Sequence, residues 1–335
     1  MLEFIIFVLG LSLLLYTLLG GADFGAGIVE TFSGRRGINT ISKAIAPIWE
    51  VNHIWLILAV VIVFNGFPKV YATFSIHLHI PLLIVLTGII LRGTAFTFRY
   101  YDVIKDNTGK IYTRFFRVSS ILTSFFLGVC LGALFLGKIP SSPVSVSFAE
   151  LYIYPWLNSF CMAMGLFTLL IFGTLAGVYL IGETKNDSEK KSFISISVYL
   201  FILLVLSGGL IFLTAYYHHM PLLKNYLDST LSMICVGVSA LSIPFTFNAI
   251  RKGKVLQSRI LVGMQITLVF GGFVSSNFPD MIVFNDHTSL TFYNASATKA
   301  TLQQLTYALI AGILIIIPSI LYLFRVFKFN PGQQM

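Results

Sequence analysis

Nine strongly apolar segments, each long enough to cross a lipid bilayer, limit what this chain can fold into. Crossing the hydrocarbon layer takes about 20 apolar residues in a helix. Of the 335 residues, 56% are apolar and 10% are charged, unlike a water-soluble domain. The sequence predicts an all-α, polytopic membrane protein with a single transmembrane domain over residues 1–335. The expected helices cover about residues 3–24, 53–74, 76–98, 115–137, 156–181, 193–217, 227–249, 258–279 and 305–327.

The basic residues are distributed unevenly between the connections, and this predicts the orientation. The odd-numbered connections and the C-terminus hold 17 Lys and Arg residues, whereas the even-numbered connections hold four. Basic residues favour the cytoplasmic side of a membrane. We therefore expect the N-terminus outside and the C-terminus in the cytoplasm. This topology accounts for the net charge of +9, so the charge does not indicate a nucleic-acid partner.

Ionisable side chains gather at the predicted cytoplasmic ends of the first three helices. Asp23 and Glu30 are seven residues apart and share one face of the first helix, as Arg92 and Arg99 do on the third. An ionisable group in a membrane-spanning helix indicates a functional site. The residues that we consider candidates for a proton pathway are Glu50, Asp23, Arg92, Trp49, Asn52 and His53.

Glu50 and Arg92 permit two interpretations. Burial and a neighbouring guanidinium act in opposite directions on the proton affinity of a carboxyl group. Together they suit a group that accepts and passes protons near neutral pH. The alternative is a static ion pair that fixes the packing of two helices, and one pair can serve both roles.

The sequence does not predict a metal site or a catalytic residue in this chain. Glu50 and His53 have the Glu-x-x-His spacing of di-iron bundles, but such bundles need two copies and the chain has one. The three cysteines form no Cys-x-x-Cys pair. His53 is expected about 30 Å from His77 and His79, across the membrane core, which is too far to bind one haem iron together.

Five motifs resemble subunit II of the cytochrome bd-type quinol oxidases, in the same order and with the same number of helices. The most specific is the Trp-acid-x-Asn-x-x-Trp pattern from Trp49 to Trp55. The motifs lie at residues 21–27, 46–57, 67–72, 91–99 and 294–296.

The resemblance implies a subunit of a respiratory oxidase in a prokaryotic cytoplasmic membrane. Such an oxidase takes electrons from a membrane quinol and reduces dioxygen to water with protons from the cytoplasm. In the family, subunit I carries the b-type haems and the d-type haem. Glu50 matches the acidic position implicated in proton delivery, and Asp23 matches a second acidic position. Membrane lipid and the quinone pool are the other expected partners, while a structural quinone and a small accessory subunit stay open.

The chain departs from the usual family motifs at four positions. Gly20 and Thr97 stand where the family has acidic residues, and Val51 stands in place of a glycine. Glu50 replaces the usual aspartate but keeps the carboxylate. Proton transfer at this position therefore remains a hypothesis.

A secondary transporter that moves protons or an anion through the Glu50 and Arg92 cluster is the alternative function. Transporters of this kind typically contain inverted repeats and helices that are broken near the middle of the membrane. The sequence shows neither feature clearly, which favours the oxidase.

The orientation can be tested with reporter fusions. Because the basic residues favour one set of connections by 17 to 4, a reporter fused at Met335 should be active on the cytoplasmic side. A reporter inserted in residues 138–155 should be active outside. The opposite pattern would contradict the predicted side of proton entry as well.

Overall fold

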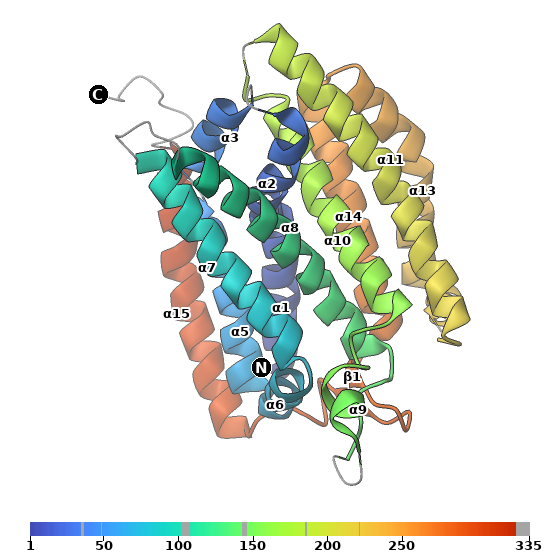
Figure 1. The fold of residues 1–335 in the computed structure, drawn as a ribbon. Helices are drawn as coiled ribbons and strands as arrows, with labels where there is room; N and C mark the ends of the chain where they lie inside the picture. The colour runs from blue at the N-terminus through green and yellow to red at the C-terminus, as the bar shows by residue number, and fades with distance from the viewer. Residues whose placement is uncertain are drawn as a thin grey trace.

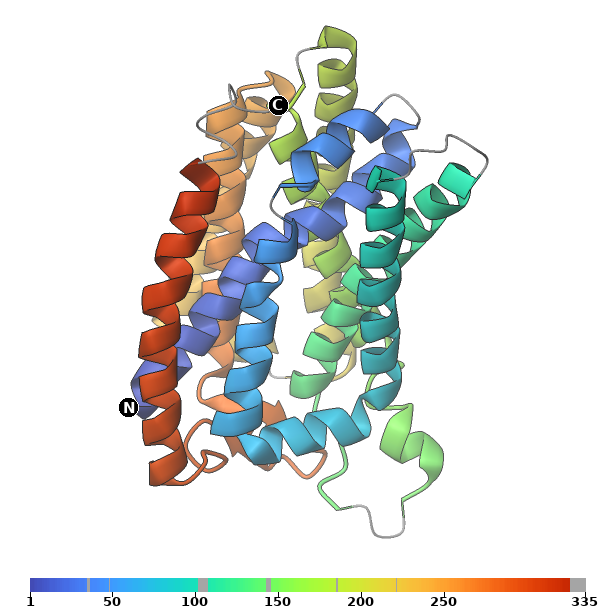
Figure 2. The same cartoon turned by 90° about the vertical axis from the view of Figure 1, so that its left-hand side faces the viewer.

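The computed structural model describes residues 1–34, 37–47, 49–101, 108–142, 146–184, 186–220 and 222–325. Within these residues, nine helices are long and apolar enough to cross a membrane, which confirms the predicted number. They form one bundle (Figure 1). The described chain begins at one end of this bundle and ends at the other, as an odd number of crossings requires (Figure 2).

The spanning helices follow the predicted apolar segments. The first span combines α1 (Leu2–Leu15), the π-helix η1 (Tyr16–Gly20) and α2 (Gly21–Ser33), and the second combines α4 (Trp49–Asn52) and α5 (Ile54–Gly66). The other seven are α7 (His79–Tyr101), α8 (Thr108–Phe135), α10 (Ser159–Leu180), α11 (Asp187–Tyr217), α13 (Thr230–Arg251), α14 (Val255–Asn277) and α15 (Lys299–Phe324).

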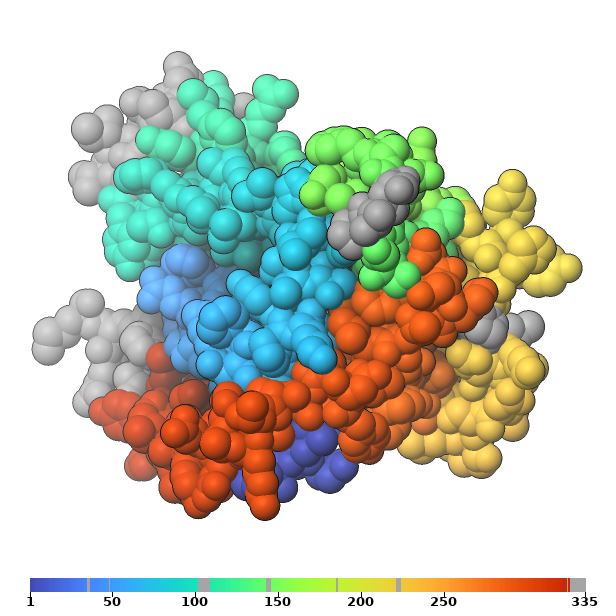
Figure 3. Space-filling model, turned by 90° about the horizontal axis from the view of Figure 1, so that it is seen from below, coloured from blue at the N-terminus to red at the C-terminus, as the bar shows by residue number. Residues whose placement is uncertain are grey.

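Short elements in the described connections complete the fold. The short helices are α3 (Ile38–Ile45), α6 (Pro68–His77), α9 (Phe148–Tyr152) and α12 (Leu222–Asp228). An unpredicted hairpin pairs β1 (Asp280–Val283) antiparallel with β2 (Ser289–Thr291). Backbone hydrogen bonds of 2.9 Å from Asn285 to Ile139, and of 2.8 Å from Ala297 to Gly66, join the hairpin region to two other connections. The hairpin region and α6 cover much of the end of the bundle that Figure 3 shows.

The structure corrects the second predicted helix, residues 53–74. The span begins earlier, at Trp49, and ends at Gly66. Phe67 leaves the helical conformation, with φ −136° and ψ 61°, and α6 begins at Pro68. Proline lacks an amide hydrogen and disfavours a helical residue before it, so the helix breaks here. α6 then lies across the end of the bundle (Figure 2).

The helix α10 lies at the centre of the bundle. Within its most apolar window, 67% of residues are buried, against 17% in α15. α10 packs against α2, α8, α11 and α14. α15 instead lies at the edge (Figure 1). The first span therefore meets the core through its second half, α2, which carries Asp23 and Glu30.

Glycines in α2 allow this helix and α10 to approach closely. A Cβ atom on Gly25 would overlap the backbone carbonyl of Phe172, and one on Gly21 would overlap the Phe172 ring. Small residues at helix contacts let backbones come together in membranes. Gly128 in α8 has the same role against the carbonyl of Met164 in α10.

Replacing Gly25 by Ala should destabilise the protein. The added methyl group meets backbone atoms that cannot rotate away, and overpacking of this kind typically costs about 1–3 kcal/mol. Gly209→Ala is the matched control, since a Cβ on Gly209 in α11 meets nothing within 4 Å. The thermal unfolding midpoint of the detergent-solubilised protein should fall for Gly25→Ala only. Equal midpoints for both variants would show that α2 and α10 do not need this contact.

Candidate functional site

The first span brings Asp23 into the interior of the bundle. Asp23 is 3% exposed and lies three residues after η1, the π-helical turn. Such turns in α-helices frequently occur at functional sites. The amide Nδ2 of Asn52 donates a hydrogen bond of 2.8 Å to Oδ2 of Asp23. The carboxyl group thus has a buried polar partner from a second span, as the predicted cluster requires.

Arg92, in α7, is the third member of this cluster. It is 1% exposed, and its Nη1 donates to Nε2 of His53 at 3.4 Å. Its guanidinium carbon lies 4.5 Å from the ring centroid of Phe24 and 5.5 Å from that of Phe116. The charge of Arg92 also acts on Asp23. A cation stacked on aromatic rings in a desolvated site is stabilised by their electron-rich faces.

The structure does not form the expected pair of Glu50 and Arg92. Glu50 is exposed, and it makes no ion pair or hydrogen bond with Arg92 among the described residues. The geometry of α4 explains the difference. Residues two apart on a helix point about 200° from one another, so the turn that directs Asn52 toward Asp23 directs Glu50 away. The carboxyl group near Arg92 is therefore that of Asp23.

Two aromatic side chains complete the surroundings of His53. The Trp49 ring lies 6.2 Å from the His53 ring and 5.7 Å from the Phe96 ring, between centroids. Trp49 thus packs the start of the second span against α7. Tyr16, in η1, was not predicted; its ring lies 6.3 Å from His53 and its hydroxyl group is buried. The sequence signal that could have identified Tyr16 is its position two helical turns before Asp23.

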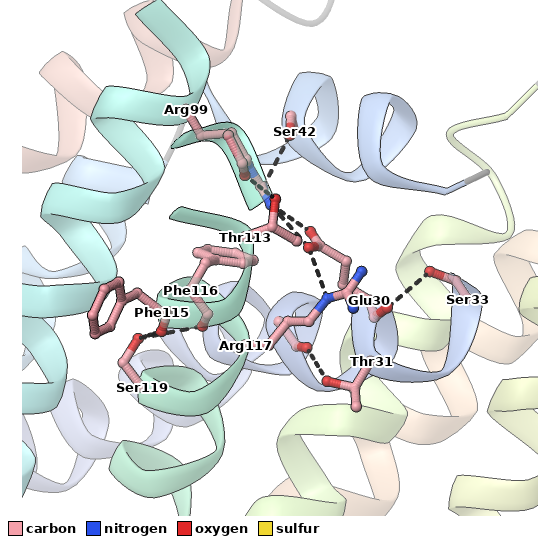
Figure 4. Close-up of polar contacts among 12 residues, drawn as sticks. Glu30, Thr31, Ser33, Ser42, Arg99, Thr113, Phe115, Phe116, Arg117 and Ser119 are labelled. Carbon is pink, nitrogen blue, oxygen red and sulfur yellow. Dashed lines mark hydrogen bonds and ion pairs between the residues drawn. The ribbon is translucent and has the colours of Figure 1, made fainter. Parts of the chain in front are cut away.

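A second buried cluster surrounds Glu30, and Figure 4 shows its carboxylate between two arginines. Glu30 is fully buried. Nη1 of Arg99 donates to both of its carboxylate oxygens, at 2.8 and 2.9 Å, and Nε of Arg117 donates to Oε1 at 3.1 Å. Nη2 of Arg99 also donates to the hydroxyl of Ser42 at 3.1 Å. The cluster joins α2, α3, α7 and α8.

The sequence predicted only part of this second cluster. Glu30 and Arg99 were placed at one level of the membrane, but Arg117 was not among the candidate residues. Arg117 lies within α8, about two and a half helical turns after Thr108. Phe116 lies between the two clusters, with its ring 5.5 Å from the guanidinium of Arg92 and 4.5 Å from that of Arg99.

The chain matches the family described as "Cytochrome bd terminal oxidase subunit II" over residues 1–327. It belongs to this family. The protein named "Cytochrome bd ubiquinol oxidase subunit 2" of Bacillus subtilis is 27% identical, over 92% of this chain and 90% of that protein. The "Cytochrome bd-I ubiquinol oxidase subunit 2" of Escherichia coli K12 is 24% identical, over 55% of this chain and 49% of that protein.

The fold is also similar to that of a solved oxidase. A chain in the structure of bd oxidase from Geobacillus thermodenitrificans superposes with a TM-score of 0.77. The match covers 98% of this chain and 99% of that one, at 21% identity. This similarity supports the nine-helix architecture of subunit II.

His53 and His77 of this subunit II do not fit an axial ligand of haem. Nε2 of His53 faces the guanidinium of Arg92, and its ring is packed against Phe24 at 5.6 Å. Nδ1 of His77 is hydrogen-bonded to the carbonyl of Leu151 at 3.1 Å. Among the described residues, no three His, Cys, Asp or Glu side chains lie where they could hold a metal ion. We derive no step through a haem bound to this chain.

Removing the charge of Glu30 should destabilise subunit II strongly. Glu30→Gln leaves two guanidiniums without their carboxylate, and breaking a buried ion pair in this way costs about 3–5 kcal/mol. Glu183→Gln is the matched control, because the Glu183 and Arg259 side chains are each 31% exposed and such pairs contribute about 0–1 kcal/mol.

Unfolding can be followed with a thiol-reactive dye, because Cys130, Cys161 and Cys235 are all buried. The midpoint of Glu30→Gln should fall well below that of Glu183→Gln. Similar midpoints for the two variants would contradict a structural role of the Glu30 cluster.

Proposed function

We propose that this chain is the haem-free subunit II of a respiratory quinol oxidase and that Asp23 relays protons toward the haem-bearing subunit I. Membership of the family supports the oxidase role. The observation that carries the proton role is a carboxyl group inside a membrane span that is 3% exposed, hydrogen-bonded to Asn52 and close to the charge of Arg92. In the complex, haem b and haem d would reduce dioxygen with electrons from a quinol.

The groups around Asp23 suit a site that gains and loses a proton. The Asn52 amide donates to the ionised carboxylate, and its own oxygen can accept from the protonated acid. Arg92 keeps its charge throughout, because guanidinium is not deprotonated in proteins. The neighbouring residues can therefore hold both protonation states of Asp23 without a large rearrangement.

Glu50 would take part in proton delivery from a different position. Its side chain is exposed at the start of the second span, on the surface of this chain. A route through Glu50 would therefore run along an interface with subunit I or with the membrane surface. Trp49, Asn52 and His53 connect this surface position to the interior cluster through packing and the Asn52 hydrogen bond.

The outer helices offer apolar surface for a partner subunit and for lipid. In α15, Leu314 and Ile315 are 69% and 68% exposed, and in α5 Ile57 is 61% exposed. Membrane lipids and the quinone pool would reach the remaining surface. A structural quinone and a small accessory subunit, which the resemblance left open, are not part of this proposal.

We further propose that the protein lies in a prokaryotic cytoplasmic membrane with the α3 end of the bundle in the cytoplasm. The distribution of Lys and Arg, 17 against 4, supports this orientation. It would put both buried clusters nearer the cytoplasm. The alternative of a secondary transporter receives no support from the relatives that the chain matches.

Replacing Asp23 by Asn should slow quinol-driven oxygen consumption by roughly 10²-fold, the typical cost of a lost acid–base group. The amide keeps the shape of the side chain and can still accept from Asn52, so haem content should stay normal. Asp286→Asn, in the exposed hairpin loop, is the control and should leave the rate unchanged. An unmodified rate for Asp23→Asn in a fully assembled oxidase would refute the relay.

A parallel variant tests the surface position. Glu50→Gln should reduce oxygen consumption if protons also pass along the exposed side of the second span. If Asp23→Asn is slow while Glu50→Gln keeps the original rate, protons reach Asp23 without Glu50. Absorbance of the d-type haem in each purified variant reports whether subunit I is still assembled.

A further inference from the structure

A cavity of about 240 Å³ extends from the surface of the protein to Asp23, between α2, α3, α10 and α14. Its inner end is lined by Asp23 and Asn52, which are each 3% exposed. Its outer end is lined by Glu183 and Arg259, whose side chains are each 31% exposed. The cavity therefore joins the surface of the protein to the buried carboxyl group.

Small side chains on three helices leave this space open. On the first span, residues 19, 22, 23 and 26 line the cavity and share one helical face. Ala22 and Ala26 are on this face, and Ala176 of α10 lines the cavity opposite them. Ala44 of α3 is half-buried and also lines the cavity. Larger residues at these four positions would fill it.

The outer end is held in place by Arg259. Its Nη2 donates to Oε1 of Glu183 at 3.0 Å and to the backbone carbonyl of Tyr179. These bonds join the first turns of α14 to the end of α10. The polar groups at the outer end thus have a fixed arrangement beside the solvent.

The cavity has the size and the polar groups that internal water needs. A water molecule occupies about 30 Å³ and requires two to four polar partners, so the space accommodates a short chain of water molecules. Asp23 and Asn52 supply partners at one end, and Glu183 and Arg259 supply them at the other. A dry cavity would be lined by apolar groups alone.

We propose that this cavity is a water-filled vestibule through which the carboxyl group of Asp23 exchanges protons with the aqueous phase beside Glu183 and Arg259. A proton carried by the water moves to a carboxylate oxygen of Asp23, which leaves the neutral acid and a water molecule. The proposal rests on the relay role of Asp23 and adds the route by which Asp23 is supplied, within subunit II itself.

Water access can be measured without reference to turnover. The probe is the trimethylammonium-ethyl methanethiosulfonate cation, which reacts with thiols in water and does not cross the membrane. In the assembled oxidase, Ala22→Cys should react at least about tenfold faster than Ala133→Cys, a fully buried position in α8 outside the cavity. The unsubstituted protein gives the background, because its three cysteines are buried. Mass spectrometry of the chain detects the adduct.

The side of access follows from the vesicles used. Ala22→Cys should react in inverted vesicles, whose cytoplasmic surface faces the reagent, and should be protected in right-side-out vesicles. Equal, slow reaction of Ala22→Cys and Ala133→Cys in both preparations would overturn the vestibule. Ala26→Cys, one helical turn further along the same face, repeats the measurement if Ala22→Cys fails to assemble.

A variant that fills the cavity tests whether the water supplies Asp23. Ala44→Phe, combined with Ala22→Cys, should slow labelling at least about tenfold and lower oxygen consumption, with normal haem absorbance. Ala44→Ser is the matched control and should change neither. If Ala44→Phe blocks labelling while oxygen consumption stays unchanged, the vestibule does not feed the relay and the proposal is wrong.

The two proposals fail in different ways. An unlabelled Ala22→Cys together with a slow Asp23→Asn would overturn the vestibule and leave the relay standing. A labelled Ala22→Cys together with an unmodified rate for Asp23→Asn would refute the relay, and with it the proton supply assigned to the cavity.

Discussion

The close contact between α2 and α10 determines where the two buried carboxyl groups of this subunit lie. At Gly25 the two backbones approach so closely that a single methyl group would overlap the carbonyl of Phe172. Two residues earlier on α2 is Asp23, and five residues later is Glu30. The depth and rotation of α2 against the central helix therefore set both the cavity that reaches Asp23 and the position at which Glu30 meets its two arginines. In a membrane, where apolar burial does not drive helices together, such a position is fixed by close packing.

The two buried clusters stabilise charged groups in an apolar bundle in different ways. Around Glu30, two arginines face one carboxylate at hydrogen-bonding distance, which suits a permanent link between helices. Around Asp23, the direct partner is a neutral amide and the arginine is instead stacked on aromatic rings. Asp23 therefore has no direct ion pair of the kind that surrounds Glu30 among the described residues. Phe116 separates the guanidiniums of the two clusters.

Sequence patterns predicted the parts of this structure that depend on the chain's local properties. The length of the apolar segments predicted nine spans. The break at Phe67 was missed, although Pro68 was a local signal, because the segment on both sides is apolar.

The prediction that Glu50 pairs with Arg92 was wrong for a different reason. Depth in the membrane follows from sequence position, but the direction of a side chain at a helix start depends on a single turn, and α4 turns Asn52 inward instead. The cavity could not be predicted, since it arises where small residues of separate helices meet.

α6 and the hairpin cover the end of the bundle that lies opposite to α3 (Figure 1). This arrangement has a consequence for the movement of protons. A membrane protein that takes protons from one side conserves energy only if protons from the other side cannot reach the same site. The membrane potential would otherwise drive protons inward from that other side. In this subunit the cavity at Asp23 opens beside α3 and the start of α14, whereas a transverse helix and a hairpin tied by backbone hydrogen bonds lie over the far end. For a subunit that takes protons through the proposed vestibule, the break at Pro68, which turns the chain across the bundle, would help to keep protons of the other side from reaching Asp23.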